Sequence, residues 1–561
     1  MRTFFTLTLV FSTFLFGIAQ PSVPGDSLKG WHLKDFSSQQ FAGISLSKAY
    51  EQLKNRKSNK IIVAVIDSGI DTLHEDLKPV LWRNSGEIPG NGIDDDKNGY
   101  VDDYYGWNFI GGKDGRNIEK CSAEKSRLYH NYKEKFEGKT IDTNQLSFQD
   151  KVAYMMWQKA AAAIEPEPGA EMQVKMMERV VQKITEHEEI IRTYLQKQEF
   201  TTADVEESKP AKENEKKAKM GYLNLMKMLP LDKEITNTFI MQELNSELSR
   251  LQDESTAKTK APYDYRSDIV KDNYFNIKDK FYGNADVMGK SSMHGTHVSG
   301  IIGAVRNNQI GVAGVADNVQ LMTIRAVPDG DEYDKDIALA VRYAVDNGAK
   351  VINMSFGKSF SPEKYWVDEA FEYAAQKDVL LIHAAGNDHK NVDSLDNFPS
   401  NTNLKGKIFA NLITVGASSD EKVAGNYAAN FSNYGQQNVD VFAPGNQIYS
   451  TLPGGNKYGF LDGTSMASPV VAGLAALIRS YFPTLTAVQV KKVIEESVMP
   501  VTEEMTVYKP GTQEAVKMKQ LCKTGGIVNA YQAVKMAKEL AVLEQPTEKQ
   551  SPSNLPKKST K

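Results

Sequence analysis

The fold class is decided by one stretch, Ile61-Ile62-Val63-Ala64-Val65-Ile66, which is continuously apolar and leads directly into Asp67-Ser68-Gly69. A strand that is buried on both faces of a parallel sheet has this unbroken pattern, whereas a strand with one solvated face alternates. Five further apolar runs have strand character, at 319–327, 351–356, 379–384, 412–416 and 439–442, and helical patterns lie between several of them, as at 334–347 and 363–376. This alternation predicts an α/β fold: a doubly wound, mostly parallel sheet flanked by helices, with functional sites at the carboxyl ends of the strands.

Residues 118–280 differ in composition from the rest of the chain, because charged residues are dense there and glycine is scarce. Such a composition favours helices. An apolar stripe with helical spacing supports this interpretation and comprises Val174, Met177, Val181, Ile184, Ile191 and Leu195. Glu188 interrupts the stripe, which argues against a long coiled coil. A second, less regular stripe runs from Ile235 to Leu251, and the polar residues 201–219 between the two stripes are expected to be loose. The sequence therefore predicts a large charged helical insertion.

The two ends of the chain predict processing and a tail. Met1-Arg2, an apolar run from Phe4 to Ile18 and small residues before Gln20 predict a signal peptide over 1–19. The apolar run is too short for a stable membrane span, and no later stretch is long enough. We therefore expect an exported protein, secreted or periplasmic. Residues 20–117 and 281–541 are expected to form the two parts of one α/β domain, and 542–561 a disordered tail.

Charge and cysteine content exclude several classes of protein. The chain has 67 basic and 71 acidic residues, a net charge of −4, which argues against a nucleic-acid partner. Apolar residues make up 41% of the chain, enough for a large core. Cys121 and Cys522 allow either one bridge or two free thiols, and the sequence leaves both open.

Three separate segments carry the residues for nucleophilic catalysis. Asp67 follows the first strand, His294 opens the segment HGTHVSG, and Ser465 lies in GTSMASP. Taken singly, they read as a turn, a surface histidine and a helix N-cap. Taken together, they meet one chemical need, because a serine hydroxyl requires an imidazole to accept its proton and a carboxylate to orient that imidazole. The sequence predicts a catalytic triad of Asp67, His294 and Ser465.

The order Asp, His, Ser along the chain is that of subtilisin. The segments IIVAVIDSGID, HGTHVSGIIGA and GTSMASPVVAGLAAL resemble the subtilisin-like serine peptidases, the subtilase family. This resemblance implies a serine endopeptidase that cleaves protein or peptide substrates through an acyl-enzyme and requires no cofactor for its chemistry. The segment ending in Asn387 is similar to the family's oxyanion-hole segment, in which the side-chain amide and the Ser465 backbone N–H would donate to the oxyanion.

The resemblance also implies which residues bind the substrate. One group, Ser355, Phe356 and Gly357, is similar to the strand that pairs with the substrate backbone. A second group would form the opposing wall of the pocket for the residue before the cut, and it comprises Ala384, Ala385 and Gly386.

Two parts of the sequence carry residue types that bind metal ions. His294 and His297 have i, i+3 spacing, but no HExxH motif accompanies them, which argues against catalytic zinc. The acidic loop 91–103 contains the pattern D-x-D-x-N-G, which suits a structural calcium ion. Its candidate ligands are Asp94, Asp96, Asn98 and Asp102. Tyr105 stands where an EF-hand has its bidentate glutamate, so a calcium site and a solvated acidic loop remain alternatives.

The insertion separates Asp67 from His294 along the chain, which loop-closure entropy tolerates. It is interpreted as a lid, a docking arm for a partner, or an internal inhibitor that contacts the protein itself. The leading hypothesis is an exported endopeptidase of the subtilisin type. The alternatives are a processing peptidase with one partner and a non-catalytic peptide-binding protein that retains the fold.

Overall fold

A computed structural model describes residues 25–229, 233, 235–502 and 505–543. The predicted signal peptide and residues 544–561 of the predicted tail lie outside these ranges. The last helix continues to Leu543, so residues 542 and 543 of the predicted tail are helical instead of disordered.

Nine strands form the main sheet in the order β10-β11-β7-β6-β5-β4-β1-β3-β2, and all neighbours are parallel except β10 and β11. The predicted fold class is confirmed. The strands are β1 (Ile61–Asp67), β2 (Gly106–Asn108), β3 (Val319–Arg325), β4 (Val351–Met354), β5 (Leu380–Ala384), β6 (Leu412–Ser418), β7 (Val441–Pro444), β10 (Met499–Pro500) and β11 (Gly526–Ile527). A separate antiparallel hairpin consists of β8 (Ile448–Leu452) and β9 (Lys457–Leu461).

Strand β1 is buried on both faces because helices cover both sides of the sheet. Val63 and Val65 join the core on one side, and Ala64 and Ile66 join the core on the other. Since successive side chains of a strand point to opposite faces, the continuous apolar run fills both cores.

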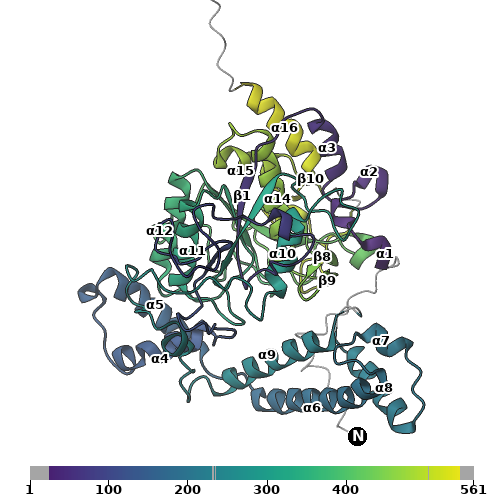
Figure 1. Ribbon diagram of the computed structural model, residues 1–561. Helices are drawn as coiled ribbons and strands as arrows, with labels where there is room; N and C mark the ends of the chain where they lie inside the picture. Colours follow the sequence, from purple (N-terminus) through teal and green to yellow (C-terminus); the bar gives the residue numbers. More distant parts are fainter. Residues whose placement is uncertain (1–24, 230–232, 234, 503–504, 544–561) are drawn as a thin grey trace, which may run out of the picture.

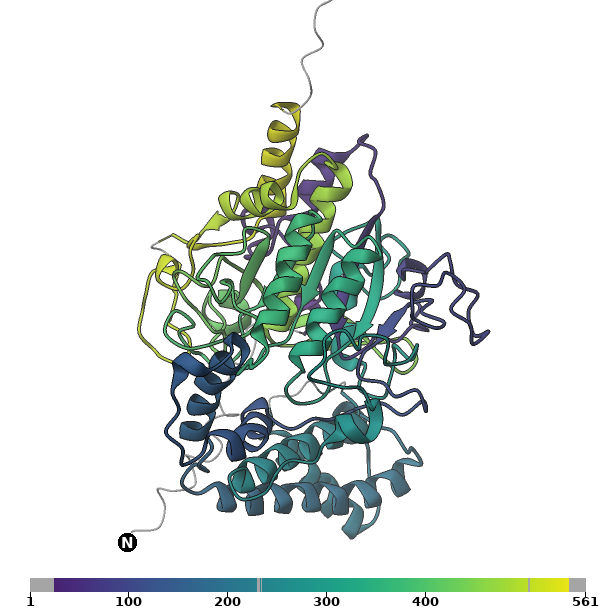
Figure 2. The same cartoon turned by 90° about the vertical axis from the view of Figure 1, so that its left-hand side faces the viewer.

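Helices α10 and α14 pack on one face of the sheet, and α11 and α12 on the other (Figures 1 and 2). The helices outside the insertion are α1 (Gly25–Leu28), α2 (Phe36–Gln39), α3 (Leu46–Leu53), α10 (Met293–Gly303), α11 (Asp334–Asp346), α12 (Lys364–Gln376), α13 (Glu421–Ala424), α14 (Thr464–Tyr481), α15 (Ala487–Glu496) and α16 (Ala530–Leu543). Glycine permits the close contact of α10 with β8, because a Cβ at Gly300 would lie 2.3 Å from the hydroxyls of Ser450 and Thr451.

The predicted insertion forms two helical units with cores of their own. The first consists of α4 (Glu124–Phe136) and α5 (Phe148–Ala163), whose core includes Phe398 of the α/β domain. The second consists of α6 (Ala170–Leu195), α7 (Thr202–Glu207), α8 (Glu213–Met226) and α9 (Asn237–Thr256). In both views the second unit lies beneath the α/β domain (Figures 1 and 2).

The expectation that residues 201–219 are loose was wrong, because they contain α7 and the first half of α8. Thr201 and Asp204 form a capping box that starts α7. Val205, Ala218 and Tyr222 are buried against the other helices of this unit. The few apolar residues of this polar stretch are therefore enough to pack its helices into the core of the second unit.

Glu188 lies inside the apolar stripe of α6 and is buried, as its position in the sequence pattern requires. Its carboxylate accepts a hydrogen bond from Asn237 at 3.1 Å and pairs with Arg192 at 2.6 Å. Burial raises the pKa of Glu188, and these two partners oppose that rise. Glu188, the residue that interrupts the apolar stripe, therefore makes a polar contact between α6 and α9.

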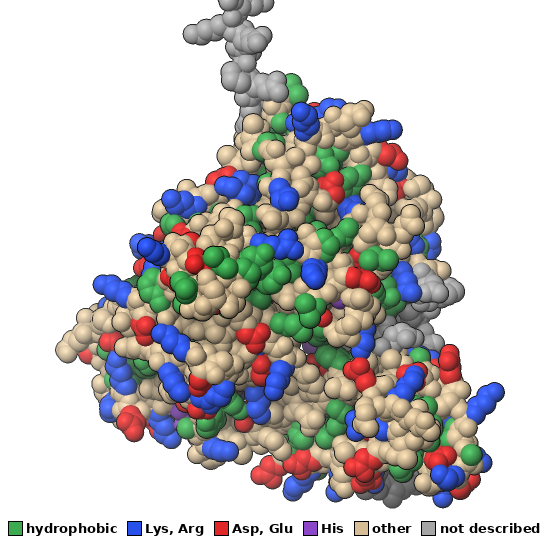
Figure 3. Space-filling view, in the orientation of Figure 1, with side chains coloured by type: hydrophobic (Ala, Val, Ile, Leu, Met, Phe, Trp, Pro, Cys, Tyr) green, Lys and Arg blue, Asp and Glu red, His purple; other side chains and the backbone are tan. Residues whose placement is uncertain are grey.

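Both cysteines are free thiols. On the face shown in Figure 3, the basic side chains are interspersed with acidic ones, in agreement with the small net charge. Within the described ranges, the helices all lack the combination of length and hydropathy that a membrane crossing needs.

Candidate active site

Asp67 and His294 form the best-defined contact of the candidate site. His294 Nδ1 donates to Asp67 Oδ1 at 2.8 Å, and the backbone N–H of Ser68 donates to the same oxygen at 2.7 Å. Asp67 ends β1, and His294 is the second residue of α10, so the sheet edge and the helix start bring them together. Asp67 is buried, whereas the His294 side chain is 38% exposed, which leaves its Nε2 face open to a reacting group.

The electrostatic surroundings of His294 favour its protonated form. Burial alone would lower its pKa, but the charge of Asp67 and the hydrogen bond to it raise the pKa above the ordinary value. Glu243 of the insertion contributes in the same direction. An imidazole that gains a proton next to a fixed carboxylate is what a general base in acyl transfer needs.

Ser465 is the second residue of α14, which packs against α10. The serine hydroxyl donates to the backbone oxygen of Ser355 at 3.2 Å, and the Ser355 hydroxyl donates to the backbone oxygen of Ser465 at 3.0 Å. The side chain of Ser465 therefore points to Ser355 and must rotate to donate to His294. Catalytic hydrogen bonds often form only when a substrate is bound.

Asn387 follows the end of β5 and faces the start of α14. Its Oδ1 accepts hydrogen bonds from the backbone N–H of Thr464 at 2.8 Å and from the Thr464 hydroxyl at 2.9 Å. With its oxygen engaged in this way, the side-chain amide Nδ2 is the free donor, and it lies beside Gly463. This orientation suits a group that donates to an oxyanion next to Ser465.

The predicted substrate-binding residues surround the same place. Residues 355–357 directly follow β4 and lie outside the strand, and Phe356 accepts a hydrogen bond from His383 at 2.8 Å through its backbone oxygen. On the other side, the Gly386 N–H donates to the hydroxyl of Thr464, and the Ala385 oxygen accepts from Asn433. Ala384 ends β5 and is buried.

His297 lies one turn after His294 but does not share its surroundings. It is buried, and its Nε2 contacts the backbone oxygen of Gly459 in β9 at 3.1 Å. Burial lowers its pKa to about 3. His297 thus packs against the hairpin that leads to Ser465.

Known proteins are similar in sequence to much of this chain. A profile described as the subtilase family matches residues 58–525. The chain belongs to the subtilase family. The thermophilic serine proteinase of Bacillus sp. (strain AK1) is 39% identical over 219 residues, which are 39% of this chain and 50% of that protein. Thermitase of Thermoactinomyces vulgaris is 33% identical over 258 residues, which are 45% of this chain and 85% of that protein.

This subtilase has two site residues that sequence reasoning missed. Thr464 fixes the orientation of Asn387, and its place beside the predicted nucleophile was the only signal for it. Glu243 of α9 lies near His294, and no local motif marks it. Burial raises the pKa of Glu243 to about 6, the charge of Asp329 adds to the rise, and His294 opposes it. The Glu243 side chain is itself exposed to solvent, although its surroundings desolvate it in part.

The acidic loop gathers a different set of carboxylates from the predicted one. One oxygen each of Glu87, Asp96 and Asp103 lie within 4.8 Å of one another. Burial raises the pKa of Glu87 and of Asp103, and Asp96 adds to both shifts. Asp102 accepts backbone N–H groups from residues 90–92 through both of its oxygens.

The other predicted ligands also hold the loop together. Asp94 accepts hydrogen bonds from the backbone N–H groups of Asn98 and Gly99. The Asn98 side-chain amide donates to Asp96 and Asp103. The ligand set Asp94, Asp96, Asn98 and Asp102 stays a prediction.

Replacing Glu243 by glutamine should shift the acidic limb of the pH profile of kcat/KM towards lower pH. Glu243 helps to raise the pKa of His294, so removing its charge lets His294 lose its proton at a lower pH. The plateau rate at high pH should stay within about twofold, because the base is neutral there in both forms. Glu247→Gln, on the same helix and paired with Arg250, is the control and should leave the profile in place. Equal profiles for Glu243→Gln and wild type would contradict the assignment.

Proposed function

We propose that this subtilase is an exported serine endopeptidase that hydrolyses peptide bonds of proteins or peptides through an Asp67–His294–Ser465 triad. The observation that carries the proposal is the 2.8 Å hydrogen bond between buried Asp67 and half-exposed His294. Ser465 stands at the start of a helix that packs on the histidine's own helix.

In the proposed mechanism, Ser465 turns away from the Ser355 oxygen and donates its proton to His294 Nε2. Its oxygen attacks the substrate carbonyl carbon, and Asp67 stabilises the imidazolium through Nδ1. His294 then gives the proton to the leaving amine, and an acyl-enzyme forms on Ser465. Water, deprotonated by His294, attacks the acyl carbon and releases the second product with the serine restored.

The oxyanion of each tetrahedral intermediate would be bound by Asn387 Nδ2 and by the backbone N–H of Ser465. Thr464 supports this role, because it holds the Asn387 oxygen away from the reacting carbonyl. The positive end of the α14 dipole lies at the same place and favours the developing negative charge.

Export is part of the proposal and rests on the sequence. The charged start, the apolar run and the small residues before Gln20 have the order of a secretory signal. A relative from Xanthomonas campestris pv. campestris, 37% identical over 224 residues, which are 37% of this chain and 36% of that protein, is named an extracellular protease.

Active-site labelling distinguishes an enzyme from a peptide-binding protein that retains the fold. A fluorophosphonate should phosphonylate Ser465 in the full chain, and Ser465→Ala should abolish the labelling because the attacking oxygen is gone. Ser468→Ala is the matched control, since that serine is buried and donates to Asn353 instead. A folded wild type that the probe leaves unlabelled would refute the proposal that the protein is an enzyme.

A digest of unfolded casein distinguishes a broad endopeptidase from a processing peptidase. Cuts at many places in casein favour the broad enzyme, whereas a single cut in one partner favours the processing peptidase.

We also propose that the acidic loop binds a structural calcium ion. The support is the convergence of the Glu87, Asp96 and Asp103 oxygens, whose mutual repulsion a hard divalent cation would relieve. Calcium prefers several carboxylate and carbonyl oxygens, and this loop supplies both. The ion would stabilise the fold and take no part in the chemistry.

Calcium binding should appear as a change in thermal stability. With calcium at 100 times its Kd, the free energy of unfolding should rise by about 2.7 kcal/mol relative to excess chelator. Glu87→Gln should lose most of this difference, whereas Asp95→Asn, in the same loop but outside the convergent trio, should keep it. The same Tm with calcium and with chelator would count against the ion.

A further inference from the structure

The loop 396–400, between β5 and β6, contacts both predicted walls of the pocket for the residue before the cut. Phe398 and Lys358 exchange two backbone hydrogen bonds, at 2.9 and 3.0 Å, and form an antiparallel bridge. Lys358 directly follows the residues predicted to pair with the substrate backbone. On the opposite wall, Asn397 Nδ2 donates to the backbone oxygen of Ala385 at 3.1 Å. The loop therefore connects the two walls.

The side-chain oxygen of Asn397 lies between these walls. A Cβ added to Gly357 of one wall would be 3.5 Å from Asn397 Oδ1, and a Cβ added to Gly386 of the other wall would be 3.8 Å from it. Because Nδ2 is bonded to the Ala385 oxygen, the position of Oδ1 is fixed. Among the residues that the structure describes, none donates a hydrogen bond to Oδ1. This oxygen is thus an acceptor that a bound side chain can reach.

The first helical unit of the insertion, α4 with α5, packs against the loop 396–400. Phe398 is buried in the core that these two helices form, where Phe136 and Trp157 are also buried. Lys159 of α5 pairs with Asp396 at the start of the loop. That ion pair is exposed on both sides and contributes little, so the buried aromatic ring makes the main attachment.

The same helical unit holds the other residue of the bridge. Glu124, the first residue of α4, pairs with Arg127 at 2.6 Å and with Lys358 at 2.8 Å. Lys358 also pairs with Asp334 at 2.9 Å. These four side chains are at most 8% exposed. Removing one partner of a buried ion pair is strongly destabilising, so Lys358 and Phe398 are both fixed by contacts with the insertion.

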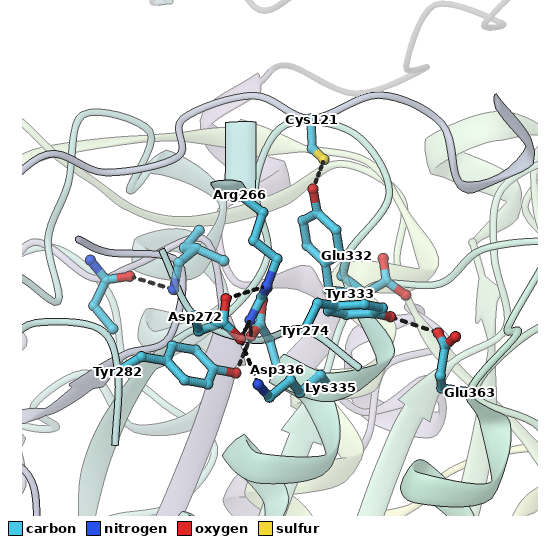
Figure 4. A network of polar contacts seen from close by, with 12 residues as sticks. Cys121, Arg266, Asp272, Tyr274, Tyr282, Glu332, Tyr333, Lys335, Asp336 and Glu363 are labelled. Carbon is cyan, nitrogen blue, oxygen red and sulfur yellow. Dashed lines mark hydrogen bonds and ion pairs between the residues drawn. The ribbon is translucent and has the colours of Figure 1, made fainter. Parts of the chain in front are cut away.

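A second buried network attaches the insertion where its chain returns to the α/β domain (Figure 4). Arg266 contacts both oxygens of Asp336 at 2.7 and 2.9 Å and pairs with Asp272 at 2.7 Å. Lys335 pairs with Asp272 at 2.5 Å. Asp334, Lys335 and Asp336 are consecutive at the start of α11. One helix start therefore anchors both ends of the insertion.

We propose that Asn397 selects the substrate side chain before the cut, favouring an uncharged one that carries a hydrogen-bond donor, such as glutamine, and that the α4–α5 unit positions Asn397 for this role. This inference rests on the proposed peptidase function and names its preferred substrate. A donor on the bound side chain satisfies Asn397 Oδ1 when the pocket fills and water leaves. An apolar side chain of equal length leaves that oxygen without a partner, which is costly.

The charge of the pocket supports the choice of an uncharged side chain. Asn397 and both walls, residues 355–357 and 384–386, are uncharged. A lysine side chain would therefore find no counter-charge on them, and a buried ammonium group needs one.

Two peptides that differ in one residue test the role of Asn397. A ten-residue peptide with glutamine before the cut should have a kcat/KM at least about fivefold above the same peptide with methionine, which has similar length and no donor. Asn397→Leu, which removes the acceptor, should lower this ratio at least about fivefold. The Ala385 oxygen keeps its bond from Asn433 in that variant. Asn401→Leu, beyond the loop 396–400, is the matched control and should keep the ratio.

A charged replacement gives a second test of the same position. Asn397→Asp should raise kcat/KM for lysine before the cut, relative to glutamine, at least about tenfold, because the carboxylate supplies the missing counter-charge. An unchanged ratio of glutamine to methionine in Asn397→Leu, or no gain for lysine in Asn397→Asp, would overturn the proposal and leave the peptidase function intact.

Loosening the α4–α5 unit tests its positioning role. Trp157→Leu, and Phe398→Leu in the same core, should each lower the ratio of glutamine to methionine at least about threefold, because the loop that carries Asn397 loses support. Labelling of Ser465 by a fluorophosphonate should stay within about twofold, since the nucleophile is unchanged. Phe200→Leu is the matched control, because Phe200 is buried in the core of the second helical unit.

The outcomes separate the positioning role from general stability and from the peptidase function. Equal ratios in Trp157→Leu and Phe200→Leu, or a loss of labelling that parallels the loss of the ratio, would overturn the positioning role. A folded wild type that the fluorophosphonate leaves unlabelled would refute the peptidase function, and this inference with it.

Discussion

The site depends on a buried carboxylate that holds an imidazole at the edge of a parallel sheet. Asp67 lies there because it is the last residue of β1. The residues before it in the strand are apolar and fill the cores on both faces of the sheet. Its Oδ1 accepts from His294 and from a backbone N–H, while its Oδ2 is buried without a hydrogen-bond partner. A buried charge with so little compensation favours a proton on the neighbouring ring, and the raised pKa of His294 expresses this preference.

Much of the fold and the triad could be predicted because their signals are local. The continuous apolar run of β1 predicted a buried parallel strand, and the segments around Asp67 and His294 predicted the pair that the structure brings together. The helices α7 and α8 were missed, since their stability comes from burial of Val205 and Tyr222 in the core of the second helical unit rather than from their own composition. Strand β2 escaped notice because Gly106–Asn108 is short and lies at the edge of the sheet, beside β3.

Long-range placement was the part that the sequence could not reveal. Glu243 of α9 affects the pKa of His294 through its charge, and nothing near Glu243 in the chain signals this. The ionic networks around Arg266 and Lys358 likewise join residues from separate segments. They tie a segment that composition marks as a separate helical unit to the α/β domain.

The central claim is that Asp67 raises the proton affinity of His294, and an NMR titration of the histidine ring protons in Ser465→Ala tests it most directly. The account predicts a pKa for His294 above the ordinary 6.5, and a drop in that pKa when Asp67 is replaced by asparagine. His32, His297 and His383 serve as internal references, because burial lowers their pKa values to about 3, 3 and 4, so they stay neutral throughout. A His294 that titrates below 6.5 and does not respond to Asp67→Asn would contradict the account.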